Sequence, residues 1–148
     1  MKKILFILIF SIISLSSIAQ YIYKGNTTYK TDIIANVSNG YIYKGDTKYQ
    51  SNIVANFDGK YLYKGNSRYK SDIICTWVNN KIYNGNSTYS SDLIAVYRSG
   101  KLYYKDLYMV LFTYQNNKIY YQDYIYKDYI LLNTSKYIHP IILYYILL

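Results

Sequence analysis

Few side chains in this sequence are of the types that carry out catalysis. Its 148 residues include one histidine, one cysteine and eight acidic residues, all of them aspartate. His139 stands beside Pro140 with no acid or nucleophile near it, so we interpret it as a loop residue rather than a general base. No close carboxylate pair, metal-ligand spacing or phosphate-binding glycine loop is visible. The sequence therefore predicts a protein that is not an enzyme and that holds no metal or cofactor.

The tyrosines, 24 in all, are the side chains best suited to bind a ligand. They recur at fixed positions beside Asn, Ser and Lys, and such a set suits stacking against sugars or adhesion through many weak sites. The alternative interpretation is that they cover the flanks of hairpins and pair across strands. The candidate ligand-binding residues are Tyr23, Tyr43, Tyr63, Tyr83, Tyr103, Asn26, Asp46, Asn66 and Asn86.

A second recurring polar position is occupied by Asp32, Asn52, Asp72 and Asp92. A calcium site needs several oxygen ligands that converge on one ion, and one carboxylate per repeat does not supply them. We therefore expect these side chains to hold the loop that enters the following strand, through hydrogen bonds to the backbone.

The candidate residues are carried by a repeat of 20 residues. Four full copies span 21–40, 41–60, 61–80 and 81–100, and two degenerate copies span 101–117 and 118–133. A fixed period of this length indicates stacked or ringed units, none of which can bury its apolar face alone. Residues 20–133 are thus expected to form one β-repeat domain.

Each repeat predicts two short strands rich in aromatic and β-branched residues. The second strand, such as Ile33 to Val37, is followed by a tight turn such as Asn39-Gly40 and by the next first strand, Tyr41 to Tyr43. The longer connection back to a second strand begins with a glycine that is expected to adopt positive φ, at Gly25, Gly45, Gly65 and Gly85. Five hairpins are predicted, at 33–43, 53–63, 73–83, 93–103 and 110–120.

Alternation along the second strand places Ile33, Ala35 and Val37 on one inward side. The middle position is small in each full copy, which indicates hairpins that converge on an axis; it holds Ala35, Ala55, Cys75 and Ala95. Cys75 is therefore a small core residue rather than a reactive thiol. The segment Ile130 to Leu132 is expected to pair with Tyr21 to Tyr23 and close the ring, which would remove exposed strand edges. The predicted fold is an all-β ring of about five hairpins.

Both ends of the chain differ from the repeats. Residues 1–19 have a basic start, an apolar stretch and small residues before Ala19, so they predict a cleaved signal peptide and a secreted or periplasmic protein. Residues 134–148 form an apolar tail too short to span a membrane, either a packed C-terminal strand or a degenerate end. The net charge of +9 would fall to +7 with the loss of Lys2 and Lys3. This modest positive charge is compatible with glycans or anionic cell-envelope polymers as partners, and no specific nucleic-acid binding is expected.

The repeat KIYNGNSTYSSDLIAVYRSG at 81–100 resembles those of bacterial secreted 5-fold β-flower proteins. The resemblance covers residue 21 to about residue 132 and implies a ring of five hairpins around an axis, with no established activity to carry over. From these observations we expect an exported, non-enzymatic binding or structural module. A glycan or cell-wall binding protein that uses the repeated tyrosines is the main alternative, and a fibre-forming adhesin is a further one.

Overall fold

The computed structural model describes residues 19–105 and 108–148. The predicted signal peptide, apart from Ala19, lies outside the described residues. The strands are β1 (Gln20–Lys24), β2 (Ile33–Ser38), β3 (Tyr41–Lys44), β4 (Ile53–Phe57), β5 (Tyr61–Lys64), β6 (Ile73–Val78), β7 (Lys81–Asn84), β8 (Leu93–Arg98), β9 (Lys101–Tyr104), β10 (Met109–Gln115), β11 (Lys118–Tyr121) and β12 (Ile130–Thr134). Five 3-10 turns, η1 (Lys30–Asp32), η2 (Gln50–Asn52), η3 (Lys70–Asp72), η4 (Ser90–Asp92) and η5 (Lys127–Tyr129), and one α-helix, α1 (Pro140–Leu147), complete the described part.

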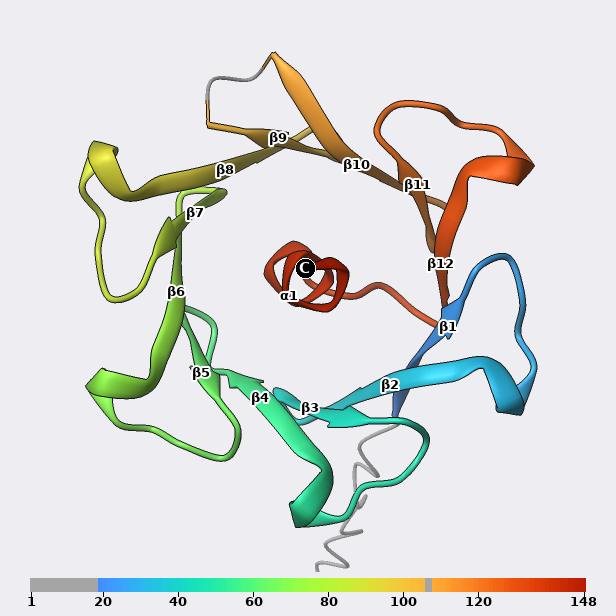
Figure 1. Ribbon diagram of the computed structural model, residues 1–148, viewed down its shortest axis with the longest axis horizontal. Helices are drawn as coiled ribbons and strands as arrows, with labels where there is room; N and C mark the ends of the chain where they lie inside the picture. Colours follow the sequence, from blue (N-terminus) through green and yellow to red (C-terminus); the bar gives the residue numbers. More distant parts are fainter. Residues whose placement is uncertain (1–18, 106–107) are drawn as a thin grey trace, which may run out of the picture.

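The twelve strands form one closed antiparallel sheet in which each strand pairs with its two neighbours along the chain. The circle closes where β1 pairs with β12, as predicted for Tyr21 to Tyr23 and Ile130 to Leu132. Figure 1 looks down the axis of this ring and shows the loops between hairpins projecting outward, with α1 on the axis. We call these loops petals; those that the structure describes throughout span 25–32, 45–52, 65–72, 85–92 and 122–129.

The prediction of about five hairpins is too low by one. The pairing of Lys24 with Leu132 in β1 and β12 repeats the pairing of Lys44 with Ala35 in β2 and β3. These two terminal strands therefore form a sixth hairpin that lacks a turn. Counting covalently connected hairpins misses this unit, because its strands lie at opposite ends of the sequence.

The tight turns have the geometry that right-twisted hairpins favour. Both central residues have positive φ in four of them, for example Asn39 (52°) and Gly40 (79°), which is the pattern of a type I′ turn. At Gly40 a Cβ would lie 2.4 Å from the carbonyl oxygen of Phe57, so the neighbouring strand also requires glycine there. The second hairpin differs, because the Asp58 carboxylate accepts hydrogen bonds from the backbone amides of Lys60 and Tyr61. The predicted positive φ at the glycine that opens each petal is confirmed at Gly25, Gly45, Gly65 and Gly85.

A β-bulge at the start of each second strand overturns the predicted alternation. In β2, Ala35 pairs with Ile22, whereas the next residue of β1, Tyr23, pairs with Ile33. Ile34 is therefore the extra residue, and Ile33 faces outward with Tyr23 instead of sharing the inner side with Ala35 and Val37. The same shift recurs at the other five junctions between hairpins.

The inner face of the ring consists of three layers of side chains, nearly all of them apolar. The layer nearest the tight turns holds Val37, Phe57, Trp77, Tyr97, Tyr114 and Thr134, and the layer nearest the petals holds Ile34, Val54, Ile74, Ile94, Leu111 and Leu131. Between them the fully buried residues of the first strands, such as Ile42 and Leu62, alternate with the small column that includes Ala35 and Cys75. Burial raises the pKa of Cys75 to about 12, in keeping with its role as a core residue. We call the two ends of the ring the turn mouth and the petal mouth.

The apolar tail is neither a strand nor a degenerate end, because it forms α1 inside the ring (Figure 1). The fully buried residues Ile138, Ile141 and Leu143 belong to the same core cluster as the inner layers. A helix that is apolar on every side must be surrounded by protein, and the ring provides that environment. The small column at Ala35 and its equivalents leaves space for this helix on the axis.

His139 is the N-cap of α1 rather than a loop residue. Its Nδ1 accepts a hydrogen bond from the amide of Ile141 at 3.3 Å, and Pro140 occupies the first helical position. The imidazole centroid lies 4.7 Å from that of Phe57 and 4.5 Å from that of Trp77. Burial lowers the pKa of His139 from 6.5 to about 4, because the charged form would lose its hydration.

This partly buried histidine predicts a loss of stability in mild acid. The unfolded chain takes up a proton near pH 6.5 and the folded protein only near pH 4, so the free energy of unfolding should fall as the pH is lowered through this range. His139→Asn keeps a side chain suited to capping but does not titrate, so the variant should lose less stability between about pH 7 and pH 5. Urea denaturation at several pH values measures both slopes, and equal slopes would contradict the burial of the imidazole.

A column of Asn and Thr residues holds the petals against the outer face of the sheet. The buried Asn36 Nδ2 donates to the carbonyl oxygens of Gly45 (2.9 Å) and Thr47 (2.8 Å), which lie in the next petal. Equivalent hydrogen bonds are made by Asn56, Thr76, Thr113 and Asn133. The petals at 25–32, 45–52, 65–72, 85–92 and 122–129 are thereby each fixed to the hairpin that precedes them around the ring.

Members of the recurring aspartate column brace their petals through hydrogen bonds to side chains, not to the backbone as expected. Asp72 accepts a hydrogen bond from the Ser67 hydroxyl, and Asp92 accepts one from Ser87. In the second petal the neutral Asn52 donates to the hydroxyl of Thr47 instead. These contacts brace the second, third and fourth petals internally.

Candidate functional site

The grooves between neighbouring petals bring together candidate residues from two consecutive repeats. In the first groove, Tyr21 and Tyr23 of β1 and Ile33 of β2 face Lys30 and Thr28 of the first petal and Asp46 of the second. Its volume is about 420 Å³. The third groove, of about 350 Å³, has the equivalent set: Tyr61, Tyr63, Ile73, Lys70, Arg68 and Asn86. The same chemistry thus recurs 40 residues along the chain, two repeat lengths away.

The bulge creates the apolar floor of these grooves. Because Ile33 and Ile73 are turned outward, each lies beside a tyrosine pair of the preceding first strand. The centroids of Tyr21 and Tyr23 are 6.4 Å apart, and those of Tyr61 and Tyr63 are 6.0 Å apart. Each groove therefore combines a hydrophobic wall with polar and charged groups along its rim.

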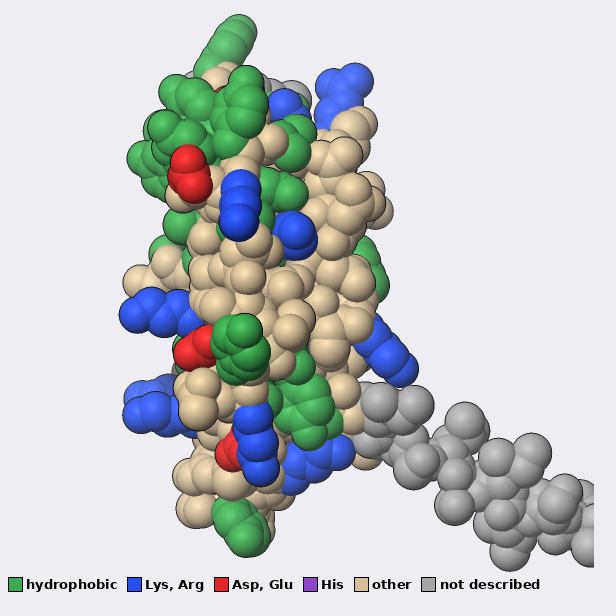
Figure 2. Space-filling model, turned by 90° about the vertical axis from the view of Figure 1, so that its right-hand side faces the viewer, with side chains coloured by type: hydrophobic (Ala, Val, Ile, Leu, Met, Phe, Trp, Pro, Cys, Tyr) green, Lys and Arg blue, Asp and Glu red, His purple; other side chains and the backbone are tan. Residues whose placement is uncertain are grey.

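The charges differ between the two grooves. In the first groove, Lys30 Nζ lies 3.4 Å from Asp46 Oδ2, and both side chains are exposed. In the third groove, asparagine replaces that aspartate, and Arg68 lies over the ring of Tyr63 with its guanidinium carbon 5.6 Å from the ring centroid. Lysine and arginine side chains outnumber aspartates along the flank in Figure 2. An uncharged or anionic polymer is therefore better matched to these rims than a cationic one.

Asp58 fixes the tyrosine wall of the third groove. The Tyr63 hydroxyl donates to Asp58 Oδ2 at 3.2 Å, and Arg68 lies 3.8 Å from the same oxygen. Partial burial would raise the pKa of Asp58, but the amides of Tyr61 and Lys60, the Tyr63 hydroxyl and Arg68 together lower it. The pKa of Tyr63 is raised by its own burial and by this carboxylate. The wall is therefore held by a charge-assisted network.

The predicted tyrosine column lies on the outer face, but its members are not equally accessible. Tyr23, Tyr43 and Tyr103 are half-buried, whereas Tyr63 and Tyr83 are buried. The loop candidates Asn26, Asp46, Asn66 and Asn86 are all exposed. Tyr23 is brought together with Asp46, and Tyr63 with Asn86, by the two grooves described.

The outward isoleucines and the basic petal residues were not among the predicted site residues. Each second strand begins with two consecutive apolar residues, such as Ile33 and Ile34, which breaks the alternation and is a signal of a bulge. The basic residues at positions 30 and 70 share one column of the repeat, so the alignment of copies also carried that information.

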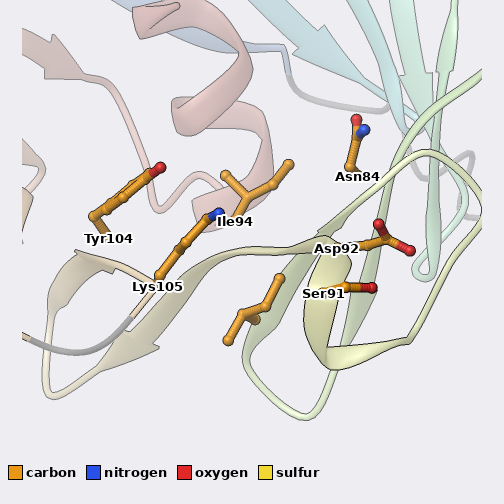
Figure 3. Close-up of a pocket in the computed structure, with 7 residues that line it drawn as sticks. Asn84, Ser91, Asp92, Ile94, Tyr104 and Lys105 are labelled. Carbon is orange, nitrogen blue, oxygen red and sulfur yellow. The ribbon is translucent and has the colours of Figure 1, made fainter.

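A further pocket lies where the fourth petal meets the petal mouth (Figure 3). Tyr104 and Lys105 approach it from one side and Asn84 and Asp92 from the other, with Ile94 between them. Its volume is about 270 Å³. The Asp92 carboxylate accepts a hydrogen bond from the Ser87 hydroxyl. We therefore assign it to bracing the petal and not to activating a nucleophile.

The described residues contain neither a membrane-crossing helix nor a metal-binding cluster. No helix within 19–105 and 108–148 is long and apolar enough to span a membrane. In the same part of the chain, no group of three His, Cys, Asp or Glu side chains is placed to hold a metal ion.

A closed ring of hairpins with one petal between each pair defines a β-flower repeat protein. The chain belongs to the family described as 6-fold beta flower protein, which matches residues 22–144. The predicted resemblance to β-flower proteins is therefore confirmed, and the predicted number of units is corrected from five to six. No curated protein and no solved structure matches the chain.

Proposed function

We propose that this β-flower protein is an exported, non-catalytic binding module whose petal grooves bind a repetitive glycan. The observation that carries the proposal is the recurrence of one side-chain set in the first and third grooves: two tyrosines, an isoleucine floor, a basic side chain, and Asp or Asn from the next petal. A sugar ring has apolar faces and peripheral hydroxyls. Aromatic walls with adjacent amide and carboxylate groups complement both.

The ring arrangement favours a polymer over a single sugar. Equivalent grooves at fixed spacing can engage successive segments of one chain, so weak sites add up to a strong overall interaction. The closed sheet also argues against growth of fibres by edge pairing, because each strand from β1 to β12 is paired on both sides. We therefore do not extend the proposal to a fibre-forming adhesin.

Removal of the groove rims tests the proposal. Lys30→Ala with Asp46→Ala disables the first groove, and Arg68→Ala with Asn86→Ala disables the third. We expect each pair to weaken binding to cell-envelope polysaccharide, and all four changes together to weaken it by about 10²-fold, because multivalent contact is lost. Surface-immobilised polysaccharide and purified residues 20–148 provide the measurement.

The matched control is Tyr49→Ala with Tyr89→Ala. These tyrosines are 70% and 76% exposed and do not line either described groove, so the control should bind as the unchanged protein does. If the control lost as much affinity for the polysaccharide as the groove variants, binding would depend on exposed petal residues in general and not on the grooves. If the protein bound none of the polysaccharides tested, the proposal that the petal grooves bind a glycan would be wrong.

A further inference from the structure

An apolar groove remains open at the petal mouth, between the end of α1 and the sheet. It is bounded by Ile34, Val54 and Ile74 on strands β2, β4 and β6, and by Tyr145, Ile146 and Leu148 at the end of the chain. Its volume of about 520 Å³ falls within the range of small-molecule sites. This groove is separate from the petal grooves, because it lies on the inner face of the ring.

The wall of this groove is fixed by packing and by one hydrogen bond. The Tyr145 hydroxyl donates to the carbonyl oxygen of Val54 at 3.1 Å, which anchors the last turn of α1 against β4. Ile34 is 36% exposed, although it occupies the inner layer. One helix thus leaves part of the inner apolar layer uncovered at this end of the ring.

Three lysines stand over the same arc of the petal mouth. Lys44 lines the groove itself and pairs with the inner residue Ala35. Lys64 pairs with Ala55 and Lys24 with Leu132, so strand alternation places these side chains on the inner face as well. Farther round the ring the same register holds Asn84, Tyr104 and Tyr121. At this register position, positive charge therefore lies on one side of the mouth only; Lys105, just after Tyr104, adds a charge farther round, beside the fourth petal.

The charge of these lysines is uncompensated within the described part of the chain. None of the three forms an ion pair with a residue in 19–105 or 108–148. All three side chains are exposed, and the inner layers beside them contain no aspartate. A ligand that fits this arrangement has an apolar body and a negatively charged end.

We propose that the groove at the petal mouth binds a medium-chain fatty acid. The alkyl chain lies along Ile34, Val54 and Ile74 beside the end of α1, and the carboxylate is held by Lys44 with Lys24 and Lys64 around it. Burial of the chain supplies affinity that grows with its length. The lysines supply selectivity for an acid over a neutral amphiphile of the same length.

Isothermal titration of residues 20–148 with laurate, below its micelle concentration, tests this proposal. The expected results are saturable binding of one molecule, tighter binding from octanoate to laurate, and binding of dodecanol at least about tenfold weaker than that of laurate. The triple variant Lys24→Gln, Lys44→Gln, Lys64→Gln should weaken laurate binding by about tenfold or more. Ile34→Trp places a larger side chain in the groove at an exposed position, so it should weaken the binding of both laurate and dodecanol.

The matched control removes three lysines at the other end of the ring, through Lys81→Gln, Lys118→Gln and Lys136→Gln. Its laurate affinity should stay within about twofold of the unchanged protein, because only distant charges are lost. Equal weakening in the two triple variants, or equal affinity for laurate and dodecanol, would overturn the role of the mouth lysines. No heat of binding, or binding only to vesicles of anionic phospholipid, would overturn the proposal itself. If the mouth triple variant fails to fold, Ile34→Trp and the comparison of ligands decide the question.

Discussion

Replacing Leu143 with alanine is expected to lower the free energy of unfolding by about 2–5 kcal/mol. Leu143 is fully buried on the axis of the ring, where it belongs to the core cluster together with the first-strand residues. The substitution leaves a cavity that a closed sheet cannot collapse to fill, so the upper part of that range applies. Urea denaturation followed by tryptophan fluorescence reports the change, since Trp77 lies in the inner layer beside the start of α1.

Leu147→Ala is the matched control for this experiment. Leu147 belongs to the same helix but is only partly buried, near the petal mouth. Its replacement should cost about 1 kcal/mol or less, because most of the removed surface still contacts water or can be recovered by neighbours. If Leu147→Ala destabilised the protein as much as Leu143→Ala, the helix would not be seated on the axis in solution.

Replacing Asn56 with alanine is expected to lower the free energy of unfolding by about 2–3 kcal/mol. Asn56 is fully buried, and its Nδ2 donates to the carbonyl oxygens of Gly65 and Ser67, both at 2.8 Å. The substitution removes both hydrogen bonds from the Asn56 side chain to the third petal and opens space behind that petal. Chemical denaturation gives the stability, and amide exchange of residues 65–72 reports the release of the petal.

Asn56→Thr tests how much of the loss of stability in Asn56→Ala comes from the missing hydrogen bonds to the petal. Threonine occupies the same column at Thr76 and Thr113, where its hydroxyl donates to one petal carbonyl at 2.7 Å. Within the described residues, Asn56 Oδ1 is buried without a hydrogen-bond partner, so the smaller side chain also removes an unsatisfied acceptor. We expect Asn56→Thr to cost about 1 kcal/mol or less, and a loss as large as that of Asn56→Ala would contradict this account.

Most of the ring could be predicted from the repeats, because a local pattern specifies each hairpin. The turn residues at Asn39-Gly40, the glycine at the start of each petal and the closing pair formed by β1 and β12 all followed from the sequence. The sixth hairpin did not, since its two strands are joined by no turn and do not look like one unit. The number of units in a ring depends on counting this closing pair as a hairpin, and that it has the register of the other hairpins is seen only in the three-dimensional structure.

The bulge and the central helix were missed for different reasons. The paired isoleucines Ile33 and Ile34 signal a bulge, but they do not show which of the two faces inward, and only the partner strand distinguishes them. The helix lacks an amphipathic pattern, because its surroundings are apolar on every side. His139, interpreted as a loop residue, is the N-cap of this helix and is followed by Pro140 at the first helical position.

The candidate site was predictable in its residue types but not in its shape. The columns containing Tyr23 and Asp46 are visible in the repeat, yet nothing local shows that Asp46 of one repeat faces the tyrosines of the repeat before it. That proximity arises from the folding of each petal over the outer face, which the buried Asn36 and its equivalents secure. Asn36 and Asn56 resemble ordinary polar strand residues in the sequence, although both are fully buried.

Because the sixth hairpin has no turn, β1 can pair either with β12 of its own chain or with β12 of another copy. Tyr21 and Ser135 are hydrogen-bonded although 114 positions separate them. The strand β1 therefore cannot pair with β12 until the end of the chain has been synthesised. During that interval the incomplete ring exposes two strand edges that another copy can occupy. Because the cost of closing a long loop rises only slowly with its length, dilute chains close on themselves, whereas crowded chains exchange terminal strands. Protein concentration during refolding therefore selects between single rings and interlocked, strand-swapped assemblies that share every native contact.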